Sequence, residues 1–236
     1  MLRLFPCRQT MPFLALDTST EYLSLAVTTP DDIVGRCWHI EQKHAEQTLP
    51  RLAELLNDCQ LTMQDIEGIA FGNGPGSFTG LRIGCGIVQG LAFACDLPVI
   101  GISTLEALAQ GCGANRVLAC LDARMNQVYA AAYERTDAGW HEVIPATVCD
   151  PHALPLPPGD DWTGVGSGFA AYGTILAEHL SGKLIATEAD RIPQAADMLA
   201  LALPRFAAGL GRPAQEAELV YLRDKVALKT SERAKP

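Results

Sequence analysis

The feature of this sequence that most constrains its fold is a pattern of strand, acid, turn and strand that occurs twice. From Phe13 the chain runs FLALD, then the polar turn TST, then the alternating segment YLSLAV. From Val117 it runs VLACLD, then ARMN, then QVYAAAY. An apolar run that ends at a polar turn and is followed by an alternating run predicts a β-hairpin. Because Asp17 and Asp122 occupy equivalent bends, the two hairpins indicate an internal duplication.

Further strands and helices are predicted after each hairpin. In the first half we predict a strand, a helix, a strand and a helix, over residues 33–40, 48–59, 66–72 and 81–95. Three strands followed by a helix, a strand and a helix is the order of a ribonuclease-H-like unit. In the second half, a proline-rich stretch precedes a strand near Trp162 and helices over about 169–180 and 194–208.

Two ribonuclease-H-like subdomains with mixed β-sheets and paired acidic turns predict an α/β protein of the actin-like ATPase (ASKHA) superfold. In that superfold a nucleotide lies in the cleft between the subdomains, but a fold alone does not establish an activity. We expect a disordered leader, an N-terminal subdomain with the partner interface, a C-terminal subdomain and a mobile basic tail, over residues 1–11, 12–103, 104–222 and 223–236. Met1 and Met11 both remain candidate start residues.

Charge, cysteines and hydropathy limit the classes of function. The formal net charge of −9 opposes direct binding to the phosphates of a nucleic acid. The eight cysteines include no C-x-x-C pair, so we expect reduced thiols in a cytoplasmic protein, without a disulfide framework or zinc site. The most apolar stretch, 81–102, carries Arg82, Gln89 and Asp96, and we therefore predict no membrane-spanning segment.

The segment GNGPGSFTGLRIG, residues 72–84, is a glycine-dense loop that runs into an apolar helix. Thr79 is the expected cap of that helix, and exposed backbone N–H groups there could receive an anion. The segment is not a Walker loop, and Arg82 in the first turn opposes the helix dipole, which favours an external role for this arginine. The alternative is a tight turn with a solvated Arg82.

The chain resembles the TsaB (YeaZ) family of tRNA threonylcarbamoyladenosine biosynthesis proteins, paralogues of the TsaD/Kae-type proteins. The resemblance rests on LDTS at 16–19, His44 followed by Leu49-Pro50, GPGSFTGLRIG at 74–84, LDAR at 121–124 and YLR at 221–223. The family motif residues are Gly74, Pro75, Gly76, Ser77, Thr79, Gly80 and Arg82. One departure is Gln127, where the family commonly has Glu.

The resemblance implies a non-catalytic partner of TsaD, the paralogue that transfers the threonylcarbamoyl group to adenosine in tRNAs decoding ANN codons. It implies a dimerisation scaffold that acts with the ATPase TsaE, pairs with itself when TsaD is absent, and reaches tRNA only through the complex. TsaD carries a metal-binding His-x-x-x-His pair, whereas here the spacing from His44 meets Thr48. A threonine hydroxyl is a poor transition-metal ligand, so we predict no metal site and no catalysis of the transfer, and expect His44 to be a cap or surface group.

The acidic turns leave a second function open. Asp17 and Asp122 could hold hydrated magnesium and weakly bound ATP or ADP, or they could be turn-stabilising residues. Candidate nucleotide- or anion-binding residues are Asp17, Thr18, Ser19, Asp122, Gly166 and Gly168. The alternative function is therefore an ATP-binding phosphotransferase or ATPase. A G-x-G-x-x-A match at 166–171 with Glu188 downstream fits a dinucleotide fingerprint, but we expect no βαβ unit around it.

The two helices of the first half are candidates for a partner surface, because the second has hardly any polar face and is rich in glycine. The alternative is that the sheet and the other half of the chain bury both helices. The candidate interface residues are Leu49, Leu52, Leu56, Ile83, Ile87 and Leu91.

Overall fold

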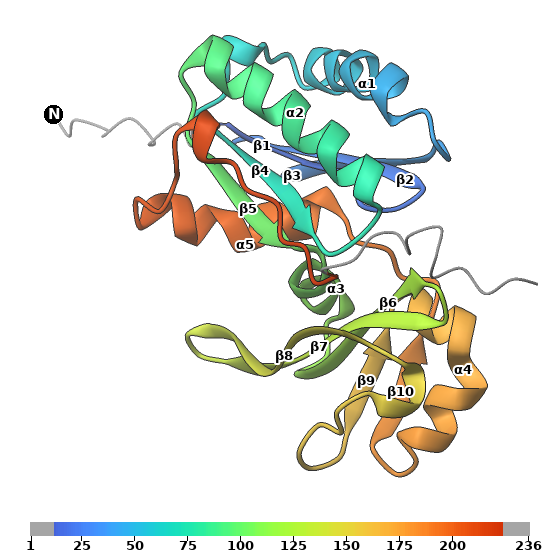
Figure 1. Ribbon diagram of the computed structural model, residues 1–236. Coiled ribbons are helices and arrows are strands. Elements are labelled where there is room, and N and C mark those ends of the chain that lie inside the picture. Colours follow the sequence, from blue (N-terminus) through green and yellow to red (C-terminus); the bar gives the residue numbers. More distant parts are fainter. Residues whose placement is uncertain (1–11, 224–236) are drawn as a thin grey trace, which may run out of the picture.

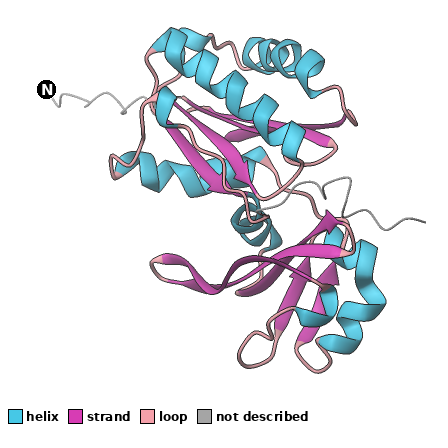
Figure 2. Cartoon of the chain, in the orientation of Figure 1, coloured by secondary structure: helices cyan, strands magenta, loops and turns pink. Residues whose placement is uncertain are grey.

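The computed structural model describes residues 12–223, which form two lobes that each contain a five-stranded mixed β-sheet (Figures 1 and 2). The predicted leader and nearly all of the predicted basic tail lie outside the described residues. The first sheet contains β1 (Phe13–Asp17), β2 (Tyr22–Thr28), β3 (Ile33–His39), β4 (Gly68–Gly74) and β5 (Val99–Ser103). The second contains β6 (Arg116–Arg124), β7 (Gln127–Thr136), β8 (Gly139–Cys149), β9 (Trp162–Val165) and β10 (Leu184–Glu188).

The two sheets have the same topology. Their strand orders are β3-β2-β1-β4-β5 and β8-β7-β6-β9-β10, so the second repeats the first with every strand in its equivalent place. In each sheet the first two strands form an antiparallel hairpin, and the first and fourth strands are parallel. The internal duplication and the actin-like α/β fold predicted from the sequence are therefore confirmed.

Two of the five helices within residues 12–223 pack on the lobe that does not directly precede them in the chain. The helices are α1 (His44–Asp58), α2 (Phe78–Cys95), α3 (Thr104–Cys112), α4 (Ser167–His179) and α5 (Ala195–Ala207), with short 3₁₀ turns η1 (Met63–Asp65), η2 (Pro151–Ala153) and η3 (Ala214–Glu216). Helix α3 follows the first sheet in the chain but packs on β6, β7 and β9, whereas α5 follows the second sheet but packs on β1, β2 and β4. The predicted range 104–222 consequently does not form one lobe, because apolar faces of α5 and η3 are buried against the first lobe.

Three local predictions need correction. Helix α1 begins at His44, four residues earlier than the predicted start, and Pro50 is its seventh residue. Proline is ordinarily confined to a first turn or a kink, yet here the helix continues through exposed Pro50, whose missing N–H leaves the carbonyl of exposed Glu46 without its helical donor. Helix α2 is capped by Ser77, whose Oγ accepts from Gly80 N at 3.3 Å, and not by Thr79. Helix α3 was not predicted at all, although Ser103 caps it in the same way.

Helix α2 is the one helix in the described chain that is long and apolar enough to cross a membrane by length and composition. Its buried residues, including Cys85, Val88 and Ala92, pack over β1 and β4 in the first core. The seven cysteines within residues 12–223 are free thiols, as expected.

Candidate functional site

The turn after β1 lies directly on the glycine motif. Thr18 Oγ1 donates to Gly80 O at 2.8 Å, and Ser77 N donates to Ser19 O at 2.7 Å. A Cβ on Gly76 would lie 2.6 Å from Ser19 O, and a Cβ on Gly80 would overlap Thr18 O. The motif is rich in glycine here because its backbone lies against the backbone of the turn after β1. Residues 17–19 therefore already cover much of the surface that was predicted to bind an anion.

Asp17 is fully buried in this contact. Its Oδ2 accepts from Ser19 N at 3.2 Å and from Ser19 Oγ at 2.8 Å, while Oδ1 lies against Gly72 without a hydrogen-bond partner in the described chain. Burial raises the pKa of the Asp17 carboxyl to about 6, although the hydrogen bonds from Ser19 lower it. On its Gly72 side, buried Oδ1 of Asp17 therefore has no room for the water ligands of a hydrated magnesium ion.

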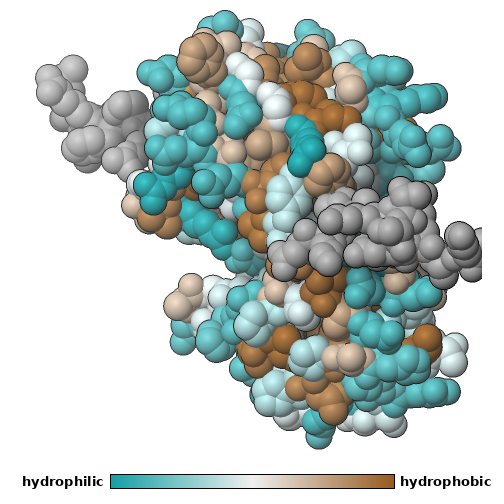
Figure 3. Space-filling view, in the orientation of Figure 1, coloured by the Kyte–Doolittle hydropathy of each residue, from teal (hydrophilic) through white to brown (hydrophobic). Residues whose placement is uncertain are grey.

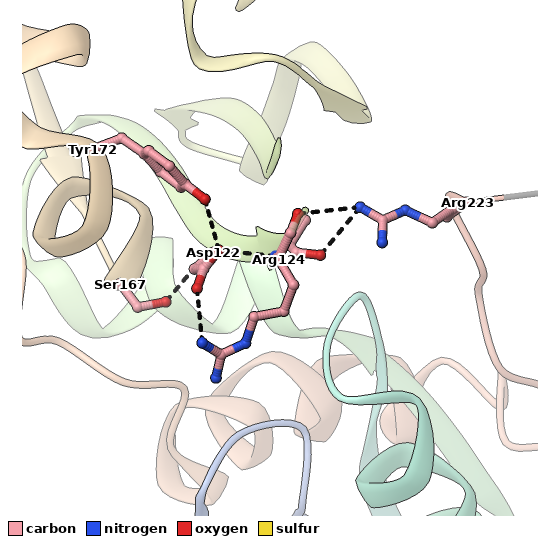
Figure 4. Close-up of polar contacts among 6 residues, drawn as sticks. Asp122, Arg124, Ser167, Tyr172 and Arg223 are labelled. Carbon is pink, nitrogen blue, oxygen red and sulfur yellow. Dashed lines mark hydrogen bonds and ion pairs between the residues drawn. The ribbon is translucent and has the colours of Figure 1, made fainter. Parts of the chain in front are cut away.

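Asp122, the equivalent acid of the second lobe, lies in a polar cluster (Figure 4). Its Oδ1 accepts from Arg124 N at 2.8 Å and from Tyr172 Oη at 3.2 Å, and its Oδ2 pairs with Arg124 Nη1 at 3.2 Å. Asp122 N donates to Ser167 Oγ at 3.1 Å. Partial burial and the Asp122 carboxylate raise the pKa of Tyr172. Asp122 therefore already has partners from its own turn and from α4.

The second glycine element packs α4 on β6. Gly166 has a φ of 101°, and a Cβ there would lie 2.6 Å from Cys120 O, while a Cβ on Gly168 would overlap Cys120 Sγ. The expectation that no βαβ unit surrounds this element is wrong, because β9, α4 and parallel β10 form one and Glu188 ends β10. Nevertheless Arg191 Nε pairs with Glu188 at 2.5 Å and the glycines are in close contact with the sheet, so a dinucleotide site is not favoured.

Arg82 makes contacts within the chain. Its guanidinium carbon lies 3.7 Å from the centroid of the Phe78 ring, and its Nε donates to Tyr221 Oη at 3.1 Å. The side chain is nevertheless exposed. The external role predicted from its unfavourable place near a helix N-terminus is not needed to explain its position, because two aromatic rings surround it.

The six candidate interface residues divide into two groups. Leu52 and Leu56 are 3% and 5% exposed and belong to the first core, so their prediction as partner contacts is wrong. They are buried because α1 turns this side toward the sheet. Leu49 is half-exposed, and Ile83, Ile87 and Leu91 lie half-buried on α2.

The outer side of α2 carries glycines that no contact among residues 12–223 requires. A Cβ on Gly86 or on Gly90 would meet no atom of the described residues within 4 Å, in contrast to Gly80 and Gly84 at the start of the same helix. Phe93, one turn beyond Gly90, is 81% exposed. Apolar and near-neutral residues run over this helix in Figure 3, with hydrophilic margins on both sides.

His44 and Thr48 are both core residues. His44 is 4% exposed and its Nε2 lies 3.2 Å from Tyr22 O, while Thr48 is fully buried and its Oγ1 donates to His44 O at 2.7 Å. The expectation that His44 is a cap or surface group is therefore wrong, because Lys43 occupies the N-cap position and His44 points inward. Within residues 12–223 no group of three or more His, Cys, Asp and Glu side chains is placed to hold a metal ion.

Sequence reasoning missed the partners of Asp122 on α4. Ser167 lies between two glycines that were singled out, so its place at the helix start could have been inferred. Tyr172 lies more than one turn into α4 at a residue with non-helical φ and ψ, and no sequence signal indicates that it faces Asp122.

Comparison with known proteins was made by sequence and by structure. A family model described as "TsaD: tRNA N6-adenosine threonylcarbamoyltransferase" matches residues 39–230. The tRNA threonylcarbamoyladenosine biosynthesis protein TsaB of Escherichia coli (strain K12) is 40% identical over 227 residues, covering 93% of this chain and 97% of that protein. TsaB of Haemophilus influenzae is also 40% identical, over 238 residues, covering 94% and 97%.

A solved structure has the same fold over its whole length. It is a crystal structure from Pseudomonas aeruginosa, described as an uncharacterized protein with similarity to peptidase YEAZ. It is 38% identical, superposes with a TM-score of 0.84, and covers 91% of this chain and 100% of its own. Nearly full-length similarity in sequence and structure, together with the matching family model, means that this chain belongs to the TsaB family of tRNA threonylcarbamoyladenosine biosynthesis proteins.

Proposed function

We propose that this protein is a non-catalytic partner of TsaD, which it binds through the exposed side of α2. It acts with TsaE as a scaffold in forming threonylcarbamoyladenosine on tRNAs that decode ANN codons. The names of the relatives support the pathway. The net charge of −9 favours contact with tRNA through partners, and the free thiols favour the cytoplasm.

The observation that carries the proposal is the pair of open glycines on α2. Glycine in a helix interior is about 1 kcal/mol less favourable than alanine, and neither Gly86 nor Gly90 makes a close contact with another described residue that would offset that cost. A glycine on an exposed helix lets the backbone of another helix approach closely. Phe93 supplies a large apolar side chain beside this contact region, as the centre of a protein interface requires.

The partner surface is therefore narrower than the one predicted from the sequence. We propose that it comprises the outer side of α2, residues 83–94, with Leu49 of α1 at its margin. Leu52 and Leu56 support it from within the core. The same surface can pair two copies of this chain, so a homodimer and the TsaD complex compete by mass action.

The absence of catalysis remains part of the proposal. The family resemblance implies that TsaD-type proteins hold the metal with a His-x-x-x-His pair. Here the same spacing from His44 meets Thr48, and both residues hydrogen-bond within the core. The cleft acids are likewise engaged, Asp17 with Ser19 and Gly72 and Asp122 with its own turn. These contacts disfavour the alternative of an ATP-binding phosphotransferase or ATPase.

The experiment that tests the proposal uses Gly90→Leu, because the new side chain enters open space in the free protein but obstructs a partner helix. We expect the variant to fold with unchanged circular dichroism, and its affinity for purified TsaD to fall roughly tenfold or more. Threonylcarbamoyl transfer by TsaD and TsaE should fall at equal protein concentrations and recover when the variant is in excess.

Gly173→Leu is the matched control. A Cβ on Gly173 of α4 would also meet no atom of residues 12–223 within 4 Å, and Gly173 lies on the other lobe. This variant should bind TsaD normally. Full binding by Gly90→Leu would refute the α2 surface, and full transfer by TsaD and TsaE without this protein would refute the scaffold role. Nucleotide turnover by the pure protein that disappears in Asp17→Ala with Asp122→Ala would favour the alternative enzyme.

A further inference from the structure

The last described segment of the chain, residues 213–223, runs from one lobe to the other (Figure 1). We call it the C-terminal strap. It begins at η3, which packs on α2, and Ala217 O lies 3.8 Å from Cys85 Sγ and 3.5 Å from Gln89 Nε2. Its first part therefore belongs to the first lobe.

The middle of the strap is fixed to the carboxyl end of β4 and the start of α2. Val220 N donates to Asn73 O at 2.8 Å, and the ring of Tyr221 lies 5.6 Å from that of Phe78. Tyr221 Oη accepts from Arg82 Nε at 3.1 Å. Gly74 is needed for this passage, because a Cβ there would lie 2.7 Å from Val220 O.

The end of the strap reaches the second lobe through Arg223. Its Nη2 donates to Ala123 O at 3.1 Å and to Gln127 Oε1 at 2.7 Å, and its Nη1 lies 3.3 Å from Met125 Sδ. Figure 4 shows Arg223 approaching the β6–β7 turn from the side opposite Tyr172. A guanidinium offers five donors in a fixed plane, which suits several acceptors at once.

The turn that receives Arg223 has an unusual backbone. Arg124, Met125 and Asn126 have φ values of 61°, 54° and 57°, a run of left-handed conformation that residues other than glycine rarely adopt. Within residues 12–223, every hydrogen bond between residues 123–127 and any part of the chain outside the second sheet and α4 comes from Arg223. The strap is thus the hydrogen-bonded connection between this turn and the first lobe.

We propose that the C-terminal strap is an inter-lobe clasp, closed by Arg223, that fixes the β6–β7 turn and the angle between the two lobes. The lobes also meet where α3 packs on α5, β4 and β5, and through Trp140 of β8, which packs against the cores of both lobes beside α3 and donates to Gln110 of that helix. These contacts lie where the chain crosses between the sheets. A pair of helices at that crossing permits rotation about it, whereas a second attachment away from it restricts rotation. The proposal concerns the isolated protein and does not depend on binding to TsaD.

The test compares Arg223→Ala, Arg223→Lys and the wild-type full chain by hydrogen–deuterium exchange and small-angle X-ray scattering. In Arg223→Ala we expect peptides covering 123–127 and 217–222 to exchange about tenfold faster, which corresponds to loss of a charged hydrogen bond. The radius of gyration should increase. Arg223→Lys keeps the charge but cannot bridge the same acceptors, so its effect should be intermediate.

The matched control is Arg36→Ala, because the exposed side chain of Arg36 donates only to its neighbour Gly35 among the described residues. It should leave both measurements unchanged. Unchanged exchange at 123–127 in folded Arg223→Ala overturns the clasp, and faster local exchange with an unchanged scattering curve overturns its role between the lobes. If Arg223→Ala exchanges faster over the whole chain, the result for Arg223→Lys decides. Faster exchange confined to the peptides covering 123–127 and 217–222 supports the clasp, whereas unchanged exchange in these peptides overturns it.

Discussion

The two lobes share strand order and an acidic turn, yet they use the acid differently. In the first lobe Asp17 is sealed beneath the glycine motif, while in the second lobe Asp122 is partly exposed and pairs with Arg124 and Tyr172. The difference arises from the glycines: those of the first motif admit residues 17–19 against α2, whereas Gly166 and Gly168 bring α4 against β6 instead. Duplication thus preserved topology while the packing around each acid diverged.

The contrast also bears on the proposed partner role, because the superfold of this chain is otherwise associated with nucleotides. A nucleotide cleft needs two accessible acids facing each other. One of these acids is now part of a core contact and the other part of a surface network.

The largest expected effect comes from Gly80→Ala, which should break the packing of the first lobe. Its Cβ would overlap the backbone oxygen of Thr18, which cannot move aside like a flexible side chain, so we expect a loss of about 3 kcal/mol in the free energy of unfolding. Chemical denaturation measures it. Gly86→Ala on the same helix is the control and should gain about 1 kcal/mol. If Gly80→Ala and Gly86→Ala have equal free energies of unfolding, Gly80 is not required for close packing of the motif.

The next effect is a pH dependence specific to Asp17. Its folded-state pKa is raised to about 6, above the ordinary value near 4, so its stabilising contribution is present at low pH and is lost as the pH rises through 6. Relative to wild type, Asp17→Asn should therefore become more stable between pH 4 and pH 7, by roughly 2–3 kcal/mol. Denaturation at several pH values gives this difference. A difference that does not change with pH would mean that Asp17 is not desolvated.

A smaller effect on the free energy of unfolding should follow from Gln127→Glu, which strengthens the hydrogen bond between Arg223 and the second lobe. A carboxylate would replace the amide oxygen that accepts from Arg223 at 2.7 Å, and charge-assisted hydrogen bonds are stronger than neutral ones. We expect a gain of about 1 kcal/mol, measured by chemical denaturation. The gain should vanish when Arg223 is alanine; a gain that persists would assign the effect to some other contact of residue 127.

The smallest effect is expected for Asp122→Asn. Arg124, its ion-pair partner, has a side chain 83% exposed, so the pair contributes little, and we expect a loss of no more than about 0.5 kcal/mol. Thermal unfolding at two salt concentrations should show little salt dependence of the difference. A loss as large as that of a core substitution would remove the contrast drawn between Asp17 and Asp122.

Much of the fold could be predicted from the sequence. Alternating and apolar runs predicted the paired hairpins, and the recurrence of one pattern predicted two equivalent sheets. Helix α3 was missed because it is short and follows β5 without a break, and the start of α1 was misplaced because Pro50 indicated a first turn. Local patterns do not show which layer a helix joins, so the crossing of α3 and α5 could not be foreseen.

The candidate site was predicted less completely. The glycine motif and both acids were identified, but Leu52 and Leu56 were assigned to a surface, although α1 turns them to the core. The sequence showed that the helix after the motif is apolar and rich in glycine. It could not separate glycines that contact residues 17–19 from those, such as Gly86 and Gly90, that face outward.

The sequence by itself determined the duplicated topology, the motif and the family resemblance, because these depend on residue order and spacing along the chain. The tertiary structure decided which acid is buried, which side of α2 is open, and that Arg223 reaches the β6–β7 turn. These properties arise from contacts between residues far apart in the chain. Whether a glycine permits close packing, or a carboxylate is buried, depends on which residues the fold places beside it.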